Sequence, residues 1–293
     1  MTSVARLFPM LLMMSAVCAH ALPNAELEQV QMPAWIERDG QRSPLEAGAV
    51  LRNGDHIETG SGSRALLRLN DGSTVKLGEN ARFEVNDMQR SGAGQGVFKA
   101  TLSVLEGAFR FTTAAIYKFG GRREIDVRFR TVTAGIRGTD LWGKSAADRD
   151  IVCLIEGRIS VTPTGQPAIE MQQPQTVYQA LQAGASPPVS AVDPAQLGKW
   201  AAETEIAAGQ GAARKGGKWR VFLMSARNGD DLADFAAQLA AAGYAARIIQ
   251  LSDEGKPAYW VYVGNLPDRA EARALADKLR AQFKLGRVSI STQ

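Results

Sequence analysis

The chain has 293 residues, which is room for about two domains at roughly 100–200 residues each. Its apolar content of 45% and charged content of 22% are ordinary for a globular protein that can build a sizeable core. The formal net charge of +4 is too small and too scattered to indicate nucleic-acid binding.

Residues 1–21 have the pattern of a secretory signal peptide. Arg6 is followed by the apolar run LFPMLLMMSAVC and by Ala19-His20-Ala21, a small-x-small cleavage pattern. The run is shorter than the about 20 residues that a membrane-spanning helix needs, which disfavours an uncleaved anchor. We therefore expect cleavage after Ala21, export to the periplasm, a mature chain with a net charge of +3 and no transmembrane segment.

The mature chain would keep one histidine, His56, and one cysteine, Cys153. This excludes an intramolecular disulfide, a cluster of His and Cys metal ligands, and a Cys-His dyad. A Ser-His-Asp triad would depend on His56, and no G-x-S-x-G motif accompanies it. Cys153 lies in the strand-like run IVCLIEG, where a buried thiol is expected. The sequence does not exclude a catalytic pair of carboxylates, but we predict a non-enzymatic protein without a metal or cofactor.

Residues 22–162 read as a β-rich domain. In SRALLRLNDGSTVKL, apolar and polar residues alternate on both sides of Asp71-Gly72, a strong hairpin signal. The same alternation recurs in EIDVRFRTVTAGI, and IVCLIEGRISVTP closes the region. Short strands separated by glycine turns predict a sandwich or a solenoid-like β-domain.

Residues 163–217 change to a composition rich in Pro, Gln, Ala and Gly, which is typical of a linker. Within it, Asp193 followed by Pro194 predicts a short helix over about 194–207.

Residues 218–293 predict a separate α+β unit. Strand-like and helix-like runs follow the order β-α-β-β-α-β, which is that of a ferredoxin-like fold, and Asp268 is the expected N-cap of the second helix. Two helices would cover one face of the sheet and leave the other face open.

Two motifs in the β-rich part resemble the FecR domain. The first is AGAVLRNGDHIETGSGSRALLRLNDGSTVKLGENARFEV, and the second is TVTAGIRGTDLW, a strand running into Arg-Gly-Thr. The resemblance covers residues 30–162 and implies a protein-binding or ligand-sensing module. We interpret Arg137, Gly138, Thr139 and Asp140 as a structural signature, in which Arg137 and Asp140 pair across a turn or satisfy backbone groups.

The C-terminal unit, residues 217–293, resembles a SPOR domain, through KWRVFLMSA and YWVYVGNLPDRAEARALADKL. The resemblance implies binding to peptidoglycan glycan strands without stem peptides. The chain departs from the usual Val-Gln at Val221-Phe222, from the usual Gly-Ser-Phe-like end at Met224-Ser225-Ala226, and from the usual Tyr-Arg-Val at Tyr259-Trp260-Val261.

The open face of that sheet is the candidate glycan-binding site. If valines at 221, 261 and 263 point toward the helices, alternation turns the neighbouring side chains outward. The candidate residues are Arg220, Phe222, Met224, Trp260 and Tyr262. An exposed aromatic patch usually marks a partner, although the linker or the β-domain could instead pack over it.

The sequence therefore favours a non-catalytic periplasmic protein that binds peptidoglycan glycan strands, with the β-domain meeting an envelope protein or a ligand. The alternative is a regulatory adaptor that binds proteins through both domains without affinity for glycan. A wall hydrolase lacks a recognisable nucleophile, base or metal set.

Overall fold

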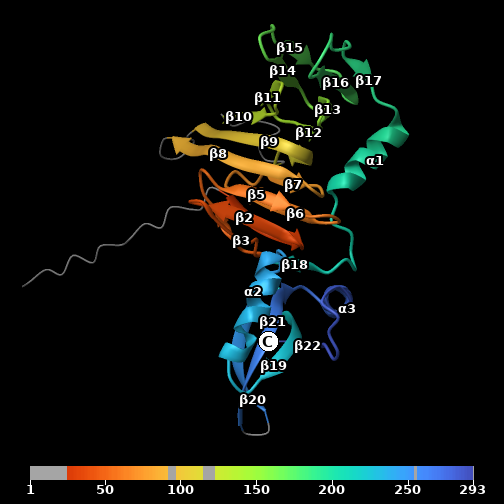
Figure 1. Cartoon of the computed structure of the whole chain (residues 1–293). Helices are drawn as coiled ribbons and strands as arrows, with labels where there is room; N and C mark the ends of the chain where they lie inside the picture. Colours follow the sequence, from red (N-terminus) through yellow and green to blue (C-terminus); the bar gives the residue numbers. More distant parts are fainter. Residues whose placement is uncertain (1–24, 92–96, 115–122, 254–255, 293) are drawn as a thin grey trace, which may run out of the picture.

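The computed structural model describes residues 25–91, 97–114, 123–253 and 256–292 (Figure 1). The predicted signal peptide, residues 1–21, and its cleavage site lie outside this range. A β-rich region occupies residues 25–214, and a smaller C-terminal unit occupies residues 219–292. No described helix is long and apolar enough to cross a membrane.

The described residues of the β-region form eighteen strands and one α-helix. They are β1 (Ala25–Gln31), β2 (Ala34–Arg38), β3 (Gln41–Pro44), β4 (Val50–Leu51), β5 (His56–Thr59), β6 (Arg64–Leu69), β7 (Thr74–Leu77), β8 (Arg82–Ser91), β9 (Val97–Thr112), β10 (Arg123–Arg128), β11 (Val132–Ile136), β12 (Asp140–Ser145), β13 (Arg149–Glu156), β14 (Ile159–Pro163), β15 (Ile169–Met171), β16 (Thr176–Leu181), β17 (Ser190–Ala191), α1 (Pro194–Thr204) and β18 (Ala212–Arg214).

The strands form two sheets that share the long strand β9. One sheet runs in the order β18-β1-β6-β7-β9-β12-β13-β16-β17, with β4 also paired to β1. The other runs in the order β3-β2-β5-β8-β9-β10-β11-β14-β15. Alternation along the strands supplies a large apolar core, which includes Leu27, Ile57, Leu67, Phe83 and Phe109, and a smaller cluster around Trp142 and Cys153. The predicted β-rich architecture is thus present.

The expected linker is part of the β-region. Strands β15, β16, β17 and β18 pair with β14, β13, β16 and β1 respectively. The prediction was wrong because it relied on local composition, whereas pairing and burial decide whether such a segment forms strands. In β16, for example, Val177 and Tyr178 are buried.

The predicted short helix is present as α1. The Asp193 carboxylate caps it by accepting hydrogen bonds from the backbone N–H groups of Ala195 and Gln196. The helix covers one face of the sheet, where Trp200 stacks on the buried Trp142 with ring centroids 4.6 Å apart.

The Arg-Gly-Thr-Asp stretch lies at the start of β12, and its ion pair differs from the expected one. Asp140 accepts hydrogen bonds from Nε and Nη2 of Arg110 at 2.9 and 2.7 Å. Arg137 is exposed, so the expected pairing of Arg137 with Asp140 was wrong. Antiparallel pairing of β12 with β9 provides Arg110, which lies 30 residues earlier in the chain.

In the rest of that stretch, backbone groups of Gly138 and Thr139 set the path of the chain. Thr139 is fully buried, and its N–H donates to the Thr113 hydroxyl at 3.1 Å. Gly138 has a φ of 73°, which lets the chain turn from β11 into β12.

The C-terminal unit consists of β19 (Trp219–Ala226), a short 3-10 helix η2 (Asp230–Leu232), α2 (Ala233–Ala241), β20 (Ala246–Asp253), β21 (Lys256–Leu266), α3 (Arg269–Gln282) and β22 (Ser289–Thr292). The sheet order is β20-β21-β19-β22, with antiparallel neighbours. Asp268 caps α3 by accepting from the Glu271 N–H. The β-α-β-β-α-β order of elements is as expected.

The two parts of the chain contact each other through direct hydrogen bonds. The Trp35 indole donates to the Ala241 carbonyl at 3.2 Å, and the Ala34 N–H donates to the Gly243 carbonyl at 3.1 Å. Gly243 has a φ of +81°, and a Cβ there would lie 2.7 Å from the Trp35 ring, so only glycine fits this contact. Nearby, the Lys278 ammonium donates a hydrogen bond to the Met32 carbonyl, and burial lowers the pKa of Lys278.

We predict that Arg110→Ala lowers the free energy of unfolding by about 2 kcal/mol, because it leaves the carboxylate of Asp140 without its cation in a largely buried position. The matched control Arg137→Ala removes an exposed cation from the same motif and should change it by less than about 0.5 kcal/mol. Urea denaturation followed by tryptophan fluorescence measures both. An equal loss in the two variants would contradict the assigned ion pair.

Candidate functional site

Strand pairing brings three of the predicted aromatic residues together. Phe222 of β19 lies directly opposite Tyr262 of β21, with ring centroids 5.8 Å apart. The Trp260 ring meets Phe222 edge to face, also at 5.8 Å. Directly opposite side chains on antiparallel strands share one face of the sheet. We call the face that carries Phe222, Trp260 and Tyr262 the aromatic face.

The helices lie on the other face of this sheet. Val221, Val261 and Val263 are buried in the apolar core together with Leu239 of α2 and with Leu275 and Leu279 of α3. Because side chains alternate along each strand, Phe222, Trp260 and Tyr262 point away from the helices.

Exposure differs among the three rings. Phe222 is only 8% exposed, whereas Trp260 and Tyr262 are partly exposed. The expectation that Phe222 is itself an exposed member of the patch was wrong, because its ring packs against the rings of both Trp260 and Tyr262.

Arg220 completes this arrangement. Its guanidinium carbon lies 4.8 Å from the centroid of the Tyr262 ring, in cation–π geometry. Among the described residues, its Nε is buried without a hydrogen-bond partner. Gly264 lies beside the pair, and a Cβ there would approach the Tyr262 ring to 3.2 Å.

Met224 does not line up with the three rings of the aromatic face. The pairing of β19 with β21 shifts between Phe222 and Met224, so that Met224 lies opposite Val261, whose side chain is buried. Ser225 takes the place opposite Trp260. The expected alternation failed here because a β-bulge inserts one extra residue into one strand. Met224 is still 38% exposed.

Residues of β20 and β22 extend the aromatic face on both sides. Arg247 and Ile249 of β20 pair with Tyr262 and Trp260, and Ser289 of β22 pairs with Phe222. Sequence reasoning missed these positions. Alternation within ARIIQLSD marks the two candidate faces of β20, but only the register with β21 identifies the one that carries Arg247.

Arg247 also contacts the β-region. Its Nη2 donates to the Glu46 carboxylate at 2.5 Å, and this contact, together with the adjacent Tyr262, raises the pKa of the guanidinium. Two arginines thus lie on either side of Tyr262, and one of them is bound to a carboxylate from the β-region.

The described residues contain no set of three or more His, Cys, Asp or Glu side chains that could hold a metal ion. His56 lies 3.7 Å from the Glu84 carboxylate on the surface of the β-region. Cys153 is fully buried, and burial raises the pKa of its thiol to about 12. It is therefore no nucleophile at neutral pH.

Comparisons with known proteins identify two families in this chain. The model of the FecR protein family matches residues 55–160, and the model of the SPOR domain matches residues 215–286. Both families are non-catalytic. No curated protein matches the chain.

Two solved structures are similar in part. Both are crystal structures, at 1.65 and 2.50 Å resolution, of a candidate anti-sigma factor from Parabacteroides distasonis ATCC 8503. Each is 12% identical and covers 81% of this chain, and the match spans 99% and 98% of the respective structures with a TM-score of 0.40. A TM-score at this level adds nothing to the description of the fold.

We predict that Cys153 in the folded protein does not react with Ellman's reagent at pH 8, since that pH is far below a thiol pKa of about 12. In guanidinium chloride the thiol should react fully, because unfolding returns it to water and to its ordinary pKa of about 8.5. Absorbance at the wavelength of the released thiolate measures both states. Rapid reaction of Cys153 in the native protein would contradict its burial and would make a catalytic thiol possible.

Proposed function

We propose that this protein, which combines a FecR domain with a SPOR domain, is a non-catalytic peptidoglycan-binding protein of the periplasm. In this proposal the aromatic face binds glycan strands and the β-region binds an envelope protein or a ligand. SPOR domains bind peptidoglycan, and FecR domains serve in regulation and sensing.

The observation that carries the proposal is the aromatic face itself. Trp260 and Tyr262 present partly exposed rings that both contact the ring of Phe222. Aromatic rings of this kind suit the apolar faces of sugar rings, while polar groups at the rim can bond hydroxyl groups. Arg220 and Ser225 provide such groups beside Tyr262 and Trp260.

The contacts between the two parts of the chain support an accessible face. The hydrogen bonds from the β-region reach the C-terminal unit at Ala241, Gly243, Arg247, Asn265, Glu271 and Lys278. Ala241, Arg247 and Asn265 lie at or next to the ends of α2, β20 and β21, and Figure 1 shows the unit extending away from the β-region. This speaks against the interpretation that the β-region covers Trp260.

We further propose the domain boundaries. The β-region would run from the mature N-terminus to about residue 214, including the Pro- and Gln-rich segment that begins at residue 163, and the SPOR unit would begin near Lys218. We also propose a ferredoxin-like fold for this unit, which the sheet order β20-β21-β19-β22 with α2 and α3 on one face supports.

The β-region is the module for a second partner in this proposal. Its described residues include no cluster that could hold a metal ion, and several of its charged side chains form ion pairs, such as Arg110 with Asp140 and Arg38 with Asp55. In this proposal the β-region therefore recognises a protein or a ligand.

One observation favours the alternative, a regulatory adaptor without affinity for glycan. Ile249 lies beside Trp260, and Leu251 on the same strand, two residues further along, is 37% exposed. An aliphatic extension of an aromatic patch also suits a protein partner. Crosslinking from Trp260 to a protein, together with no retention on sacculi, would favour this function.

We predict that the full-length protein sediments with purified sacculi, more strongly after an amidase has removed stem peptides. Trp260→Ala should weaken this binding about ten-fold or more, since a central aromatic residue is typical of the positions that dominate an interface. Cosedimentation over a series of sacculus concentrations measures the change.

Leu105→Ala is the matched control, because Leu105 is an apolar side chain of β9 that is 40% exposed on the β-region. It should bind like the wild type. Unchanged binding of Trp260→Ala, or no sedimentation of the wild type, would overturn the proposed function.

A further inference from the structure

Arg247 joins the aromatic face to the β-region. On one side it lies opposite Tyr262, and on the other its Nη2 donates to Oε2 of Glu46. The side chain is 61% exposed, so a bound ligand could reach the same guanidinium. It is therefore the residue at which a ligand of the aromatic face and the β-region meet.

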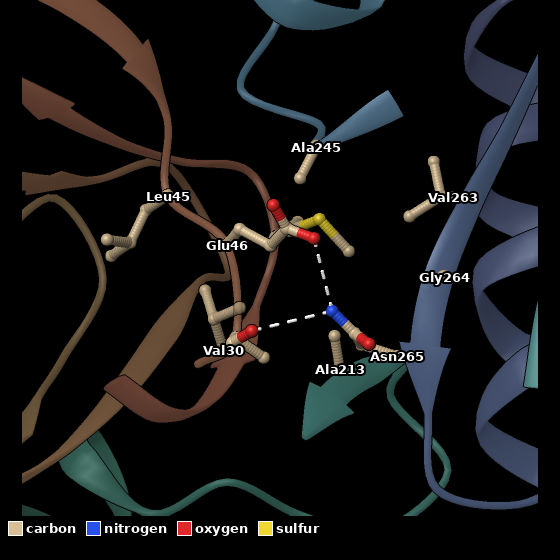
Figure 2. A pocket seen from close by; sticks show the side chains of 10 residues that line it. Val30, Leu45, Glu46, Ala213, Ala245, Val263, Gly264 and Asn265 are labelled. Carbon is tan, nitrogen blue, oxygen red and sulfur yellow. Dashed lines mark hydrogen bonds between the residues drawn. The ribbon is translucent and has the colours of Figure 1, made fainter. Parts of the chain in front are cut away.

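Glu46 is held between the two parts of the chain. Its Oε1 accepts from the Asn265 amide at 3.2 Å, and the same amide group approaches the Ala47 carbonyl at 3.4 Å. Figure 2 shows the Asn265 side chain reaching from the end of β21 to both acceptors, beside a cavity of about 10 Å³ lined by Val30, Leu45, Ala213 and Ala245. Such a cavity holds at most about one water molecule. The Glu46 carboxylate thus accepts hydrogen bonds from both Asn265 and Arg247 of the C-terminal unit.

The chemistry of the proposed ligand supplies an anion. Hydrolysis of the amide that joins a stem peptide to its sugar breaks the C–N bond, adds water, and leaves a carboxylate on the sugar and an amine on the peptide. Arginine suits carboxylates because its planar guanidinium offers paired N–H donors. Arg220 and Arg247 flank Tyr262, and the buried Nε of Arg220 has no partner among the described residues.

We propose that Arg220 and Arg247 select carboxylate-bearing glycan on the aromatic face, and that Glu46 of the β-region competes with the glycan carboxylate for Arg247. This inference rests on the proposed function and adds a regulatory role for the β-region. Two carboxylates at one guanidinium repel each other, so the β-region lowers the affinity of the face for acidic glycan. A partner that draws Glu46 away would raise it.

The test uses the full-length protein and two soluble probes. One probe is glycan oligosaccharide freed of stem peptides by an amidase, and the other is the same oligosaccharide with its carboxylates reduced to alcohols. The variant Glu46→Gln keeps an amide oxygen for Asn265 and Arg247 but removes the charge. Glu58→Gln is the matched control, because Glu58 pairs with Arg42 at 2.6 Å elsewhere on the β-region and its loss changes the net charge equally.

Calorimetric titration at low salt should show that Glu46→Gln binds the acidic probe about three-fold more tightly than the wild type, as expected for one partly exposed ion pair. Its affinity for the reduced probe should stay unchanged, and Glu58→Gln should match the wild type with both probes. Arg247→Gln should weaken binding of the acidic probe about three-fold and abolish the gain from Glu46→Gln in the double variant.

Unchanged or weaker binding of the acidic probe by Glu46→Gln would overturn the competition. Equal affinity of the wild type for both probes would overturn the selection of carboxylates, while the proposed function stands. If the wild type binds neither probe, the proposed function itself fails.

Discussion

The C-terminal unit is organised by one feature of its packing: both helices, α2 and α3, cover the same face of a four-stranded sheet. The inward valines of β19 and β21 bury themselves against α2 and α3, and this forces Phe222, Trp260 and Tyr262 onto the opposite face. The apolar packing that stabilises the unit and the ring cluster proposed to bind glycan are therefore two consequences of the same alternation. A change that slips the register of this strand pair would lose both.

The second constraint is the contact between the two parts of the chain. Trp35 packs against Gly243, Lys278 reaches the Met32 carbonyl, and Glu46 lies between Arg247 and Asn265. The same end of the C-terminal unit thus carries the hydrogen bonds to the β-region and borders the aromatic face. Binding on that face and binding to the β-region are physically connected at a single arginine.

Local signals predicted much of the fold. Alternation predicted the strands, Asp193 and Asp268 predicted two helix starts, and both families were identified from motifs confirmed by the family models. Strand alternation also predicted that Phe222, Trp260 and Tyr262 share a face, and the rings of Trp260 and Tyr262 both contact Phe222. Each of these features depends on residues close to one another in the sequence or on the simple period of a strand.

Features set by long-range pairing were missed. The cation for Asp140 is Arg110 on a neighbouring strand, and the supposed linker gains its strands only by pairing with β13, β14 and β1. The pairing of β19 with β21 contains the bulge that moves Met224 out of line with the three rings. The pairing of β20 with β21 sets the register that places Arg247 beside Tyr262. No local pattern contains that information, because register depends on the packing of both strands.

The central claim is that the aromatic face is the glycan-binding surface. The most direct test is nuclear magnetic resonance of the isotope-labelled full-length protein, titrated with glycan oligosaccharide that lacks stem peptides. The account predicts that backbone amide shifts concentrate in residues 219–226 and 259–264, with smaller changes near Arg247 and Glu46. Shifts confined to the strands of the β-region, or to the helical face of the C-terminal unit, would contradict it.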